Sequence, residues 1–116
     1  MKIDFSKGSV TLVIAPVDGR SGFDCLAKIS QDYLHIDVNK GQDWVVFINR
    51  NRTMVKVIHS DAFGNLLLTR RLHQGKFQQL LHRAEGVATK PISPKELQRY
   101  LDGEQLEIKR TSLLKG

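Results

Sequence analysis

The sequence has one cysteine and no long hydrophobic run. The first excludes a protein held together by internal disulfides, and the second argues against a membrane-spanning helix. With Cys25 alone, an intramolecular disulfide is impossible, and this favours a reducing compartment. No stretch approaches the roughly 18 consecutive apolar residues of a membrane helix. The start MKIDFSKGSV is polar where a signal peptide needs an apolar stretch. We therefore expect a cytoplasmic protein that makes no membrane contact.

Acidic residues are scarce in one part of the chain. The net charge of the whole chain is +6, yet residues 1–49 have a net charge of −1 and residues 84–116 of +1. Residues 50–83 account for the entire excess, with Asp61 as their single acid. The basic residues of this middle third are Arg50, Arg52, Lys56, Arg70, Arg71, Lys76 and Arg83. Such a concentration indicates a basic patch on the surface rather than a general basic bias.

The length of 116 residues fits one domain, residues 1–116, with one compact core. Residues 9–15 are rich in β-branched side chains and predict a strand. Apolar residues then recur every three or four positions from Phe23 to Leu34, which predicts a helix. Ser21 or the residues just before it would cap this helix, and Asp24 would lie in its first turn.

Three strand-length segments follow at residues 44–49, 53–60 and 65–72, with short turns between them that predict an antiparallel meander. Residues 86–93 read as extended. Residues 93–103 predict a second helix, because Ser93, Pro94 and Glu96 form a capping box and Gly103 stops the helix. Residues 104–110 alternate like an edge strand, and residues 77–83 fit either a strand or a helical turn. The predicted class is α+β: a small antiparallel sheet packed with two helices.

Four segments resemble a known family. VDGRSGFDCLAKI, WVVFINRNRTMVKVI, DAFGNLLLTRRLHQGKF and ISPKELQRYLDG are similar, in this order, to motifs of the TnpB accessory proteins of the insertion-sequence-sixty-six family of bacterial transposons. The resemblance spans residues 10–105. The matched positions are Asp18, Arg20, Gly22, Phe23, Asp24, Leu26, Arg50, Lys56, Asp61, Gly64, Arg70, Arg71, Leu72, Gly75 and Phe77. The resemblance implies a part in transposition beside a separate transposase, with no established activity of its own.

Two interpretations of the basic residues remain. Arginines and lysines on a sheet surface or rim can neutralise DNA phosphates, but they also protect edge strands from aggregation. The transposon setting favours the first interpretation. We therefore expect weakly sequence-specific DNA contact in a bacterial cytoplasm, with association with the nucleoid. The expected contacts are Arg50, Arg52, Lys56, Arg70, Arg71, Lys76 and Arg20.

The run from Asp18 to Asp24 lies at a strand-to-helix junction, where backbone N–H groups can hold an anion. A structural interpretation fits better, because Asp18 and Arg20 can pair while Phe23 anchors the helix. We assign structural roles to the matched acidic, glycine and phenylalanine positions: Asp18, Gly22, Phe23, Asp24, Asp61, Gly64, Gly75 and Phe77. Among the other aromatic residues, Trp44 and Phe47 lie in an apolar run, so we expect them in the core. Phe63 lies in a turn, so we expect its side chain to be exposed.

No catalytic site is predicted. Asp18, Asp24 and Asp61 are the only carboxylates at the matched positions, and the helix and the turn explain Asp24 and Asp61 locally. Cys25 lies in a largely apolar helix, where a buried thiol is usually inert. The four histidines have no metal-ligand spacing. We therefore expect no enzyme, no cofactor and no metal.

A different function class is a protein adaptor. Exposed edge strands and the C-terminal segment LEIKRTSLLKG could dock the transposase by strand addition, and a basic surface meets an acidic protein as readily as it meets DNA. An apolar face would instead favour a homodimer. The sequence leaves the adaptor and the homodimer open as alternatives or additions to DNA contact.

Overall fold

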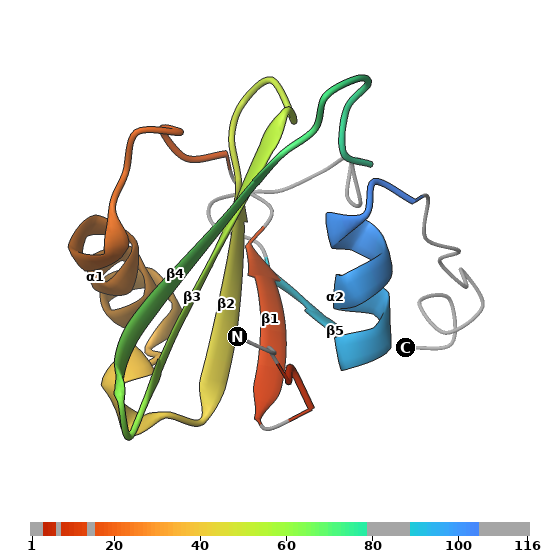
Figure 1. Ribbon diagram of the computed structural model, residues 1–116. Helices are drawn as coiled ribbons and strands as arrows, with labels where there is room; N and C mark the ends of the chain where they lie inside the picture. Colours follow the sequence, from red (N-terminus) through yellow and green to blue (C-terminus); the bar gives the residue numbers. More distant parts are fainter. Residues whose placement is uncertain (1–3, 7, 14–15, 79–88, 105–116) are drawn as a thin grey trace, which may run out of the picture.

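The computed structural model describes residues 4–6, 8–13, 16–78 and 89–104. Its centre is a five-stranded sheet with the strand order β4-β3-β2-β1-β5 (Figure 1). The strands are β1 (Ser9–Val13), β2 (Asp43–Ile48), β3 (Met54–Asp61), β4 (Gly64–Arg71) and β5 (Thr89–Ile92). The helices are α1 (Phe23–Leu34), the 3-10 helix η1 (Val38–Lys40) and α2 (Pro94–Leu101). The expected α+β class, the central meander and the two α-helices are confirmed.

The sheet is mixed, and here it differs from the expected antiparallel arrangement. β1 pairs parallel to β2, with Ser9 opposite Asp43 and Leu12 opposite Val46. The other three pairs are antiparallel. The connection between β1 and β2 contains α1 and η1, so the chain returns to the starting end of the sheet before it enters β2. This crossover explains the parallel pair, and it depends on tertiary packing that a local pattern does not contain.

Helices cover both faces of the sheet. On one face, Val10, Val46 and Val57 pack with Leu97 and other residues of α2. On the other face, Val45 and Ile58 pack with Leu26 and its neighbours on α1. Successive side chains of a strand point to opposite faces, so one strand supplies both clusters. Both faces of the sheet therefore carry part of the core.

The two helices begin in different ways. α1 has Gly22 as its N-cap and no side-chain cap, so the expected cap by Ser21 is wrong, although Asp24 does lie in the first turn. α2 has the predicted capping box, in which the Ser93 side chain accepts from the Glu96 N–H while the Glu96 carboxylate accepts from the Ser93 N–H. These reciprocal bonds satisfy two otherwise unpaired N–H groups.

Two segments were predicted at residues 77–83 and 104–110, and their residues 79–83 and 105–110 lie outside the described residues. The extended segment predicted at residues 86–93 corresponds to β5 where the structure describes it. Trp44 and Phe47 are buried as expected, and Phe63 is exposed as expected. Among the described residues, no helix has the length and apolar character needed to cross a membrane.

Candidate nucleic-acid interface

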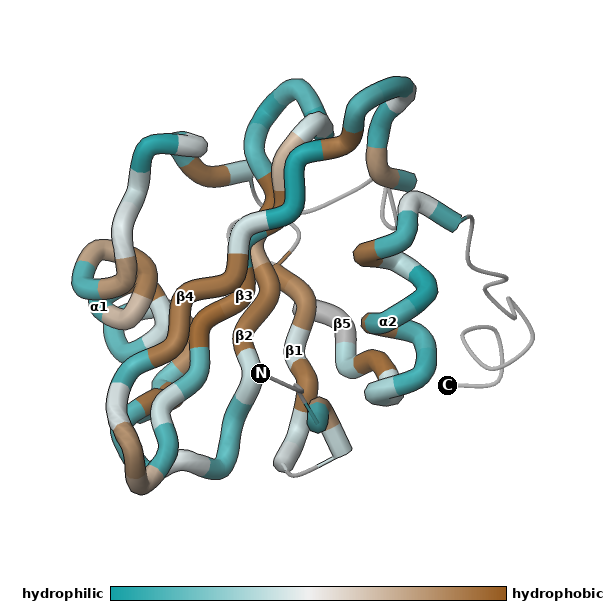
Figure 2. Tube along the Cα trace, viewed as in Figure 1, coloured by the Kyte–Doolittle hydropathy of each residue, from teal (hydrophilic) through white to brown (hydrophobic). Residues whose placement is uncertain are grey.

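The topology brings three loops to one end of the sheet. β1 and β2 are parallel and so end at the same edge, while β3 starts there and β4 returns to it. The loop after β1, the turn between β2 and β3, and the segment after β4 therefore meet at the top of the view in Figure 1. Figure 2 shows that the turn and much of the segment after β4 are hydrophilic. We call this region the basic end, formed by Arg20, Arg50, Arg52, Lys56, Arg70, Arg71 and Lys76.

The turn between β2 and β3 is organised by Asn49. Its side-chain oxygen accepts from the N–H groups of Thr53 and Met54 at 3.0 and 3.1 Å, and its amide nitrogen donates to the Thr53 hydroxyl at 3.1 Å. Asn is favoured in turns because its short side chain can bond nearby backbone groups. Asn49 was not among the expected functional residues. Its bonds fix the backbone that presents the exposed Arg50.

Arg52 has a structural function within the same turn. Its backbone is left-handed, with φ of 59°, a conformation that is uncommon for residues other than glycine. Its guanidinium donates to the Phe77 carbonyl at 3.4 Å, while the Phe77 N–H donates to the Arg52 carbonyl at 2.7 Å. The half-buried Arg52 thus connects the turn to the segment after β4, which leaves fewer of its donors available for a phosphate.

Lys56 also points inward. Its half-buried side chain lies on the α1 face of the sheet, and its ammonium donates to the Ser21 carbonyl at 2.7 Å. This bond joins the middle of the sheet to the loop before α1. Lys56 therefore has a structural role, and only the remaining N–H donors of its ammonium group could contact a phosphate.

The two arginines at the end of β4 point to opposite faces of the sheet. Arg70 pairs with Val55 on the α2 side, and Arg71 pairs with Met54 on the α1 side. Both arginines are exposed, as is Lys76, which follows Gly75 in a turn where the glycine has φ of 76°. The cations thus surround one end of the sheet and do not share a single face.

Arg20 is exposed but carries its own counter-ion. The Asp18 carboxylate accepts from the Arg20 N–H at 2.9 Å and from its guanidinium at 3.2 and 3.1 Å. These bonds hold the pKa of Asp18 below its usual value and raise the pKa of Arg20. Phe23 packs against the α1-side core, and Gly22 provides the helix N-cap. These contacts agree with the structural interpretation of the motif.

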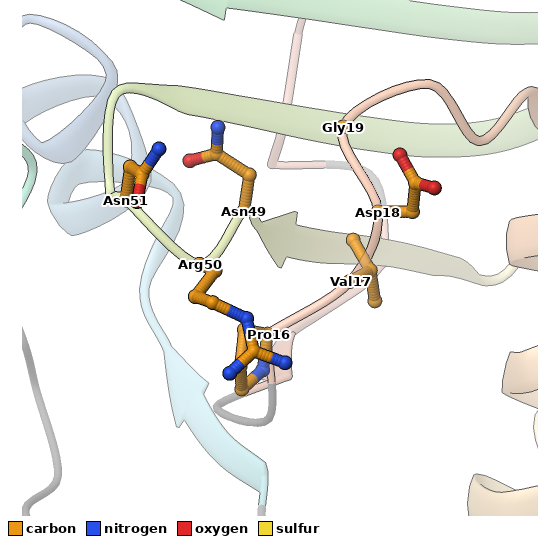
Figure 3. Close-up of a pocket in the computed structure, with 7 residues that line it drawn as sticks. All are labelled: Pro16, Val17, Asp18, Gly19, Asn49, Arg50 and Asn51. Carbon is orange, nitrogen blue, oxygen red and sulfur yellow. The ribbon is translucent and has the colours of Figure 1, made fainter.

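An open pocket of about 380 Å³ lies between the first loop and the turn (Figure 3). Residues 16–19 line one side and residues 49–51 the other. Figure 3 shows the Arg50 side chain reaching toward Pro16. The pocket lies beyond the carboxyl ends of the two parallel strands, where α/β proteins commonly bind ligands. The sequence pattern did not reveal it, because the pocket depends on the parallel pairing of β1 and β2.

The expected carboxylates do not converge. Asp18 lies at the basic end and Asp24 in the first turn of α1, whereas Asp61 lies at the opposite end of the sheet, where β3 ends. There its carboxylate accepts from the N–H groups of Phe63 and Gly64 at 2.8 and 3.1 Å and so closes the turn. Among the described residues, no group of His, Cys, Asp and Glu has an arrangement that could hold a metal ion.

Two further expectations concern single residues. Cys25 was expected to be buried in α1 but is exposed, because it lies off the helix face that packs on the sheet. Phe77 is fully buried beside Tyr100, with 5.3 Å between the ring centroids. It anchors the segment after β4, as its structural assignment requires.

Comparison with known proteins identifies a family and a curated relative that the chain resembles. A family model described as IS66 Orf2 like protein matches residues 8–111. The uncharacterized protein y4hO of Sinorhizobium fredii (strain NBRC 101917 / NGR234) is 37% identical over 94 residues, which cover 81% of this chain and 78% of that protein. No solved structure matches the chain.

Proposed function

The chain belongs to the IS66 Orf2-like family of transposition-associated accessory proteins, and on that basis we propose that it contacts the DNA backbone through its basic end and helps to assemble the transposase complex. The proposal assigns no reaction to the chain itself. It places the protein in the bacterial cytoplasm, on the nucleoid, where the DNA and the transposase would be its partners.

The observation that supports DNA contact is a set of exposed cations that form no ion pair with the described part of the chain. Arg50, Arg70, Arg71 and Lys76 are exposed and make no ion pair with any described residue. Arg20, in contrast, is paired with Asp18, and Arg52 and Lys56 donate to backbone carbonyls. Four exposed cations around one end suit the phosphates of a duplex, which recur along each strand of the duplex.

The test is a titration with duplex DNA at several salt concentrations, using random and transposon-end sequences. Each neutralised phosphate contributes about −0.9 to the slope of log K against log salt, so four contacts predict a slope of about −3.6. Because backbone contacts carry no sequence information, the two DNA sequences should bind almost equally. A marked preference for transposon ends would instead indicate contacts to base edges.

The decisive variant is Arg50→Glu with Arg70→Glu, which should abolish binding. Its matched control is Lys40→Glu with Lys95→Glu, which changes the net charge equally. Lys40 precedes β2 and Lys95 lies in the first turn of α2, so both residues are remote from the basic end. Equal loss of binding in both variants would mean that binding depends on the net charge of the protein and not on the position of the cations. If the natural chain does not bind DNA even at low salt, the proposal fails, and titration against the transposase would then test the adaptor function.

A further inference from the structure

The outer edge of β4 is not covered by any strand that the structure describes. β4 is the last strand on its side of the sheet, and its eight residues pair without interruption with β3. The opposite edge strand, β5, has four residues and contains Pro91, which has no N–H to offer. Proteins usually protect long edges with proline, bulges or central charges, and β4 has none of these between Asn65 and Thr69.

The hydrogen-bonding groups that face outward can be identified. The Leu72 N–H donates to the Thr53 carbonyl at 3.1 Å, toward β3. Because backbone groups alternate in direction along an antiparallel strand, the odd-numbered residues of β4 direct their N–H and C=O groups away from β3. These residues are Asn65, Leu67, Thr69 and Arg71. Four successive outward positions form a template for another strand.

The side chains along this edge are self-complementary. In NLLLT, residues 65–69, a leucine stands at the centre, one leucine on each side, and a polar residue at each end. Leu66 and Leu68 are half-buried against the core, and Leu67 is 39% exposed. A second β4 running antiparallel about Leu67 would put leucine opposite leucine and the Asn65 amide opposite the Thr69 hydroxyl. Matched cross-strand pairs of this kind stabilise sheets.

The charges also favour antiparallel self-pairing. β3 ends at Asp61, Phe63 lies in the turn before β4, and β4 ends at Arg70 and Arg71. Antiparallel pairing about Leu67 places the Phe63 ring, which is 98% exposed, opposite Arg71 of the second copy, where a cation–π contact is available. A parallel arrangement would instead bring the arginines of the two copies together, and like charges on adjacent strands are destabilising.

We propose that the outer edge of β4 pairs antiparallel with β4 of a second copy of this chain, with Leu67 on a two-fold axis that joins the two five-stranded sheets. The dimer depends on edge hydrogen bonds and apolar contacts, so it should persist at high salt. This inference does not rest on DNA contact, and its test uses no DNA.

The test is cross-linking of the full chain combined with sedimentation. Cys25→Ser removes the one cysteine, and Leu67→Cys then places a thiol on the proposed axis, where opposite Cα atoms lie about 5.5 Å apart, within reach of a disulfide. Mild oxidation should give a covalent dimer. The control is Cys25→Ser with Phe63→Cys, on the same hairpin but four residues from the axis, and it should remain uncross-linked.

Charge substitution at the axis gives a second measurement. Leu67→Lys and Leu67→Glu should each sediment as monomers, because like charges would meet on the axis, whereas their mixture should restore the dimer. A natural chain that stays monomeric overturns the proposal, as does cross-linking through Phe63→Cys. Dimers that form only after removal of residues 105–116 also overturn it, because the chain's own tail would then occupy the edge.

Discussion

At the scale of single residues, Tyr100 joins α2 to the segment after β4. Its side chain is 1% exposed, and its hydroxyl donates to the Gln78 carbonyl at 2.9 Å. Burial raises the pKa of Tyr100 well above its usual value. The folded state therefore holds this proton at pH values where the unfolded chain has released it, so the contribution to stability falls as pH rises above about 10.

We predict that Tyr100→Phe lowers the free energy of unfolding near neutral pH by about 1–2 kcal/mol, because the hydrogen bond from the Tyr100 hydroxyl to the Gln78 carbonyl is lost. The variant should also lose less stability than the natural chain when the pH is raised above about 10. Urea unfolding over that pH range measures both effects. Tyr33→Phe is the control, because Tyr33 is exposed and should change neither. Parallel pH curves for the natural chain and Tyr100→Phe would contradict this account.

At the basic end, we assign a mainly structural role to Lys56 and a DNA-binding role to Arg50. Lys56→Met keeps the length of the side chain but removes the donor to the Ser21 carbonyl, so we predict a loss of about 1 kcal/mol in unfolding free energy. Arg50→Met should leave stability within about 0.5 kcal/mol, because Arg50 is exposed, and should weaken DNA binding more. Urea unfolding and DNA titration of both variants test the difference. The reverse order in either measurement would contradict the assigned roles.

At the scale of elements, local signals predict an element only when all its determinants are close in sequence. Ser93, Pro94 and Glu96 lie within one turn, so α2 and its capping box follow directly from the sequence. The helix Phe23–Leu34 also followed from its apolar spacing, but its N-cap did not: Ser21 does not cap α1, and its carbonyl accepts from Lys56, which lies 35 residues away in the sequence. The parallel pairing of β1 with β2 could not be predicted from the spacing of apolar residues either. Side chains alternate between the two faces in the same way in parallel and antiparallel strands.

We predict that Ser93→Ala lowers the free energy of unfolding by about 1 kcal/mol, because the Glu96 N–H loses its side-chain acceptor. Lys95→Ala, an exposed change in the same turn, should stay within about 0.5 kcal/mol. Thermal unfolding of both variants gives the comparison. Equal effects would mean that the capping box contributes little to this helix.

At the scale of the whole molecule, the sequence showed which segment carries the excess charge but not how its cations are arranged in space. The middle third was correctly identified as basic, yet alternation along β4 sends Arg70 and Arg71 to opposite faces. Arg52 and Lys56 could not be distinguished from exposed cations, because their carbonyl partners are distant in sequence. Only the folded topology shows which cations remain unpaired among the described residues.

Clustered cations of one sign should make the stability of the protein depend on salt. We predict that added sodium chloride raises the melting temperature of the natural chain, because screening acts over about 10 Å at 0.1 M and weakens repulsion among Arg50, Arg70, Arg71 and Lys76. The increase should be smaller for Arg50→Glu with Arg70→Glu. Calorimetry at several salt concentrations measures it, and an equal salt response in both proteins would mean that the cations do not repel one another appreciably.

The stacking of Trp44 on His59 gives the protein an internal optical reporter. The two rings are parallel within 4° and their centroids are 3.7 Å apart. Trp44 is the only tryptophan in the chain and lies at the start of β2, whereas Arg50 follows the end of that strand. DNA bound at the basic end would not touch the indole, but unfolding would separate the rings. Tryptophan fluorescence therefore distinguishes variants that have lost a contact from variants that have lost the fold.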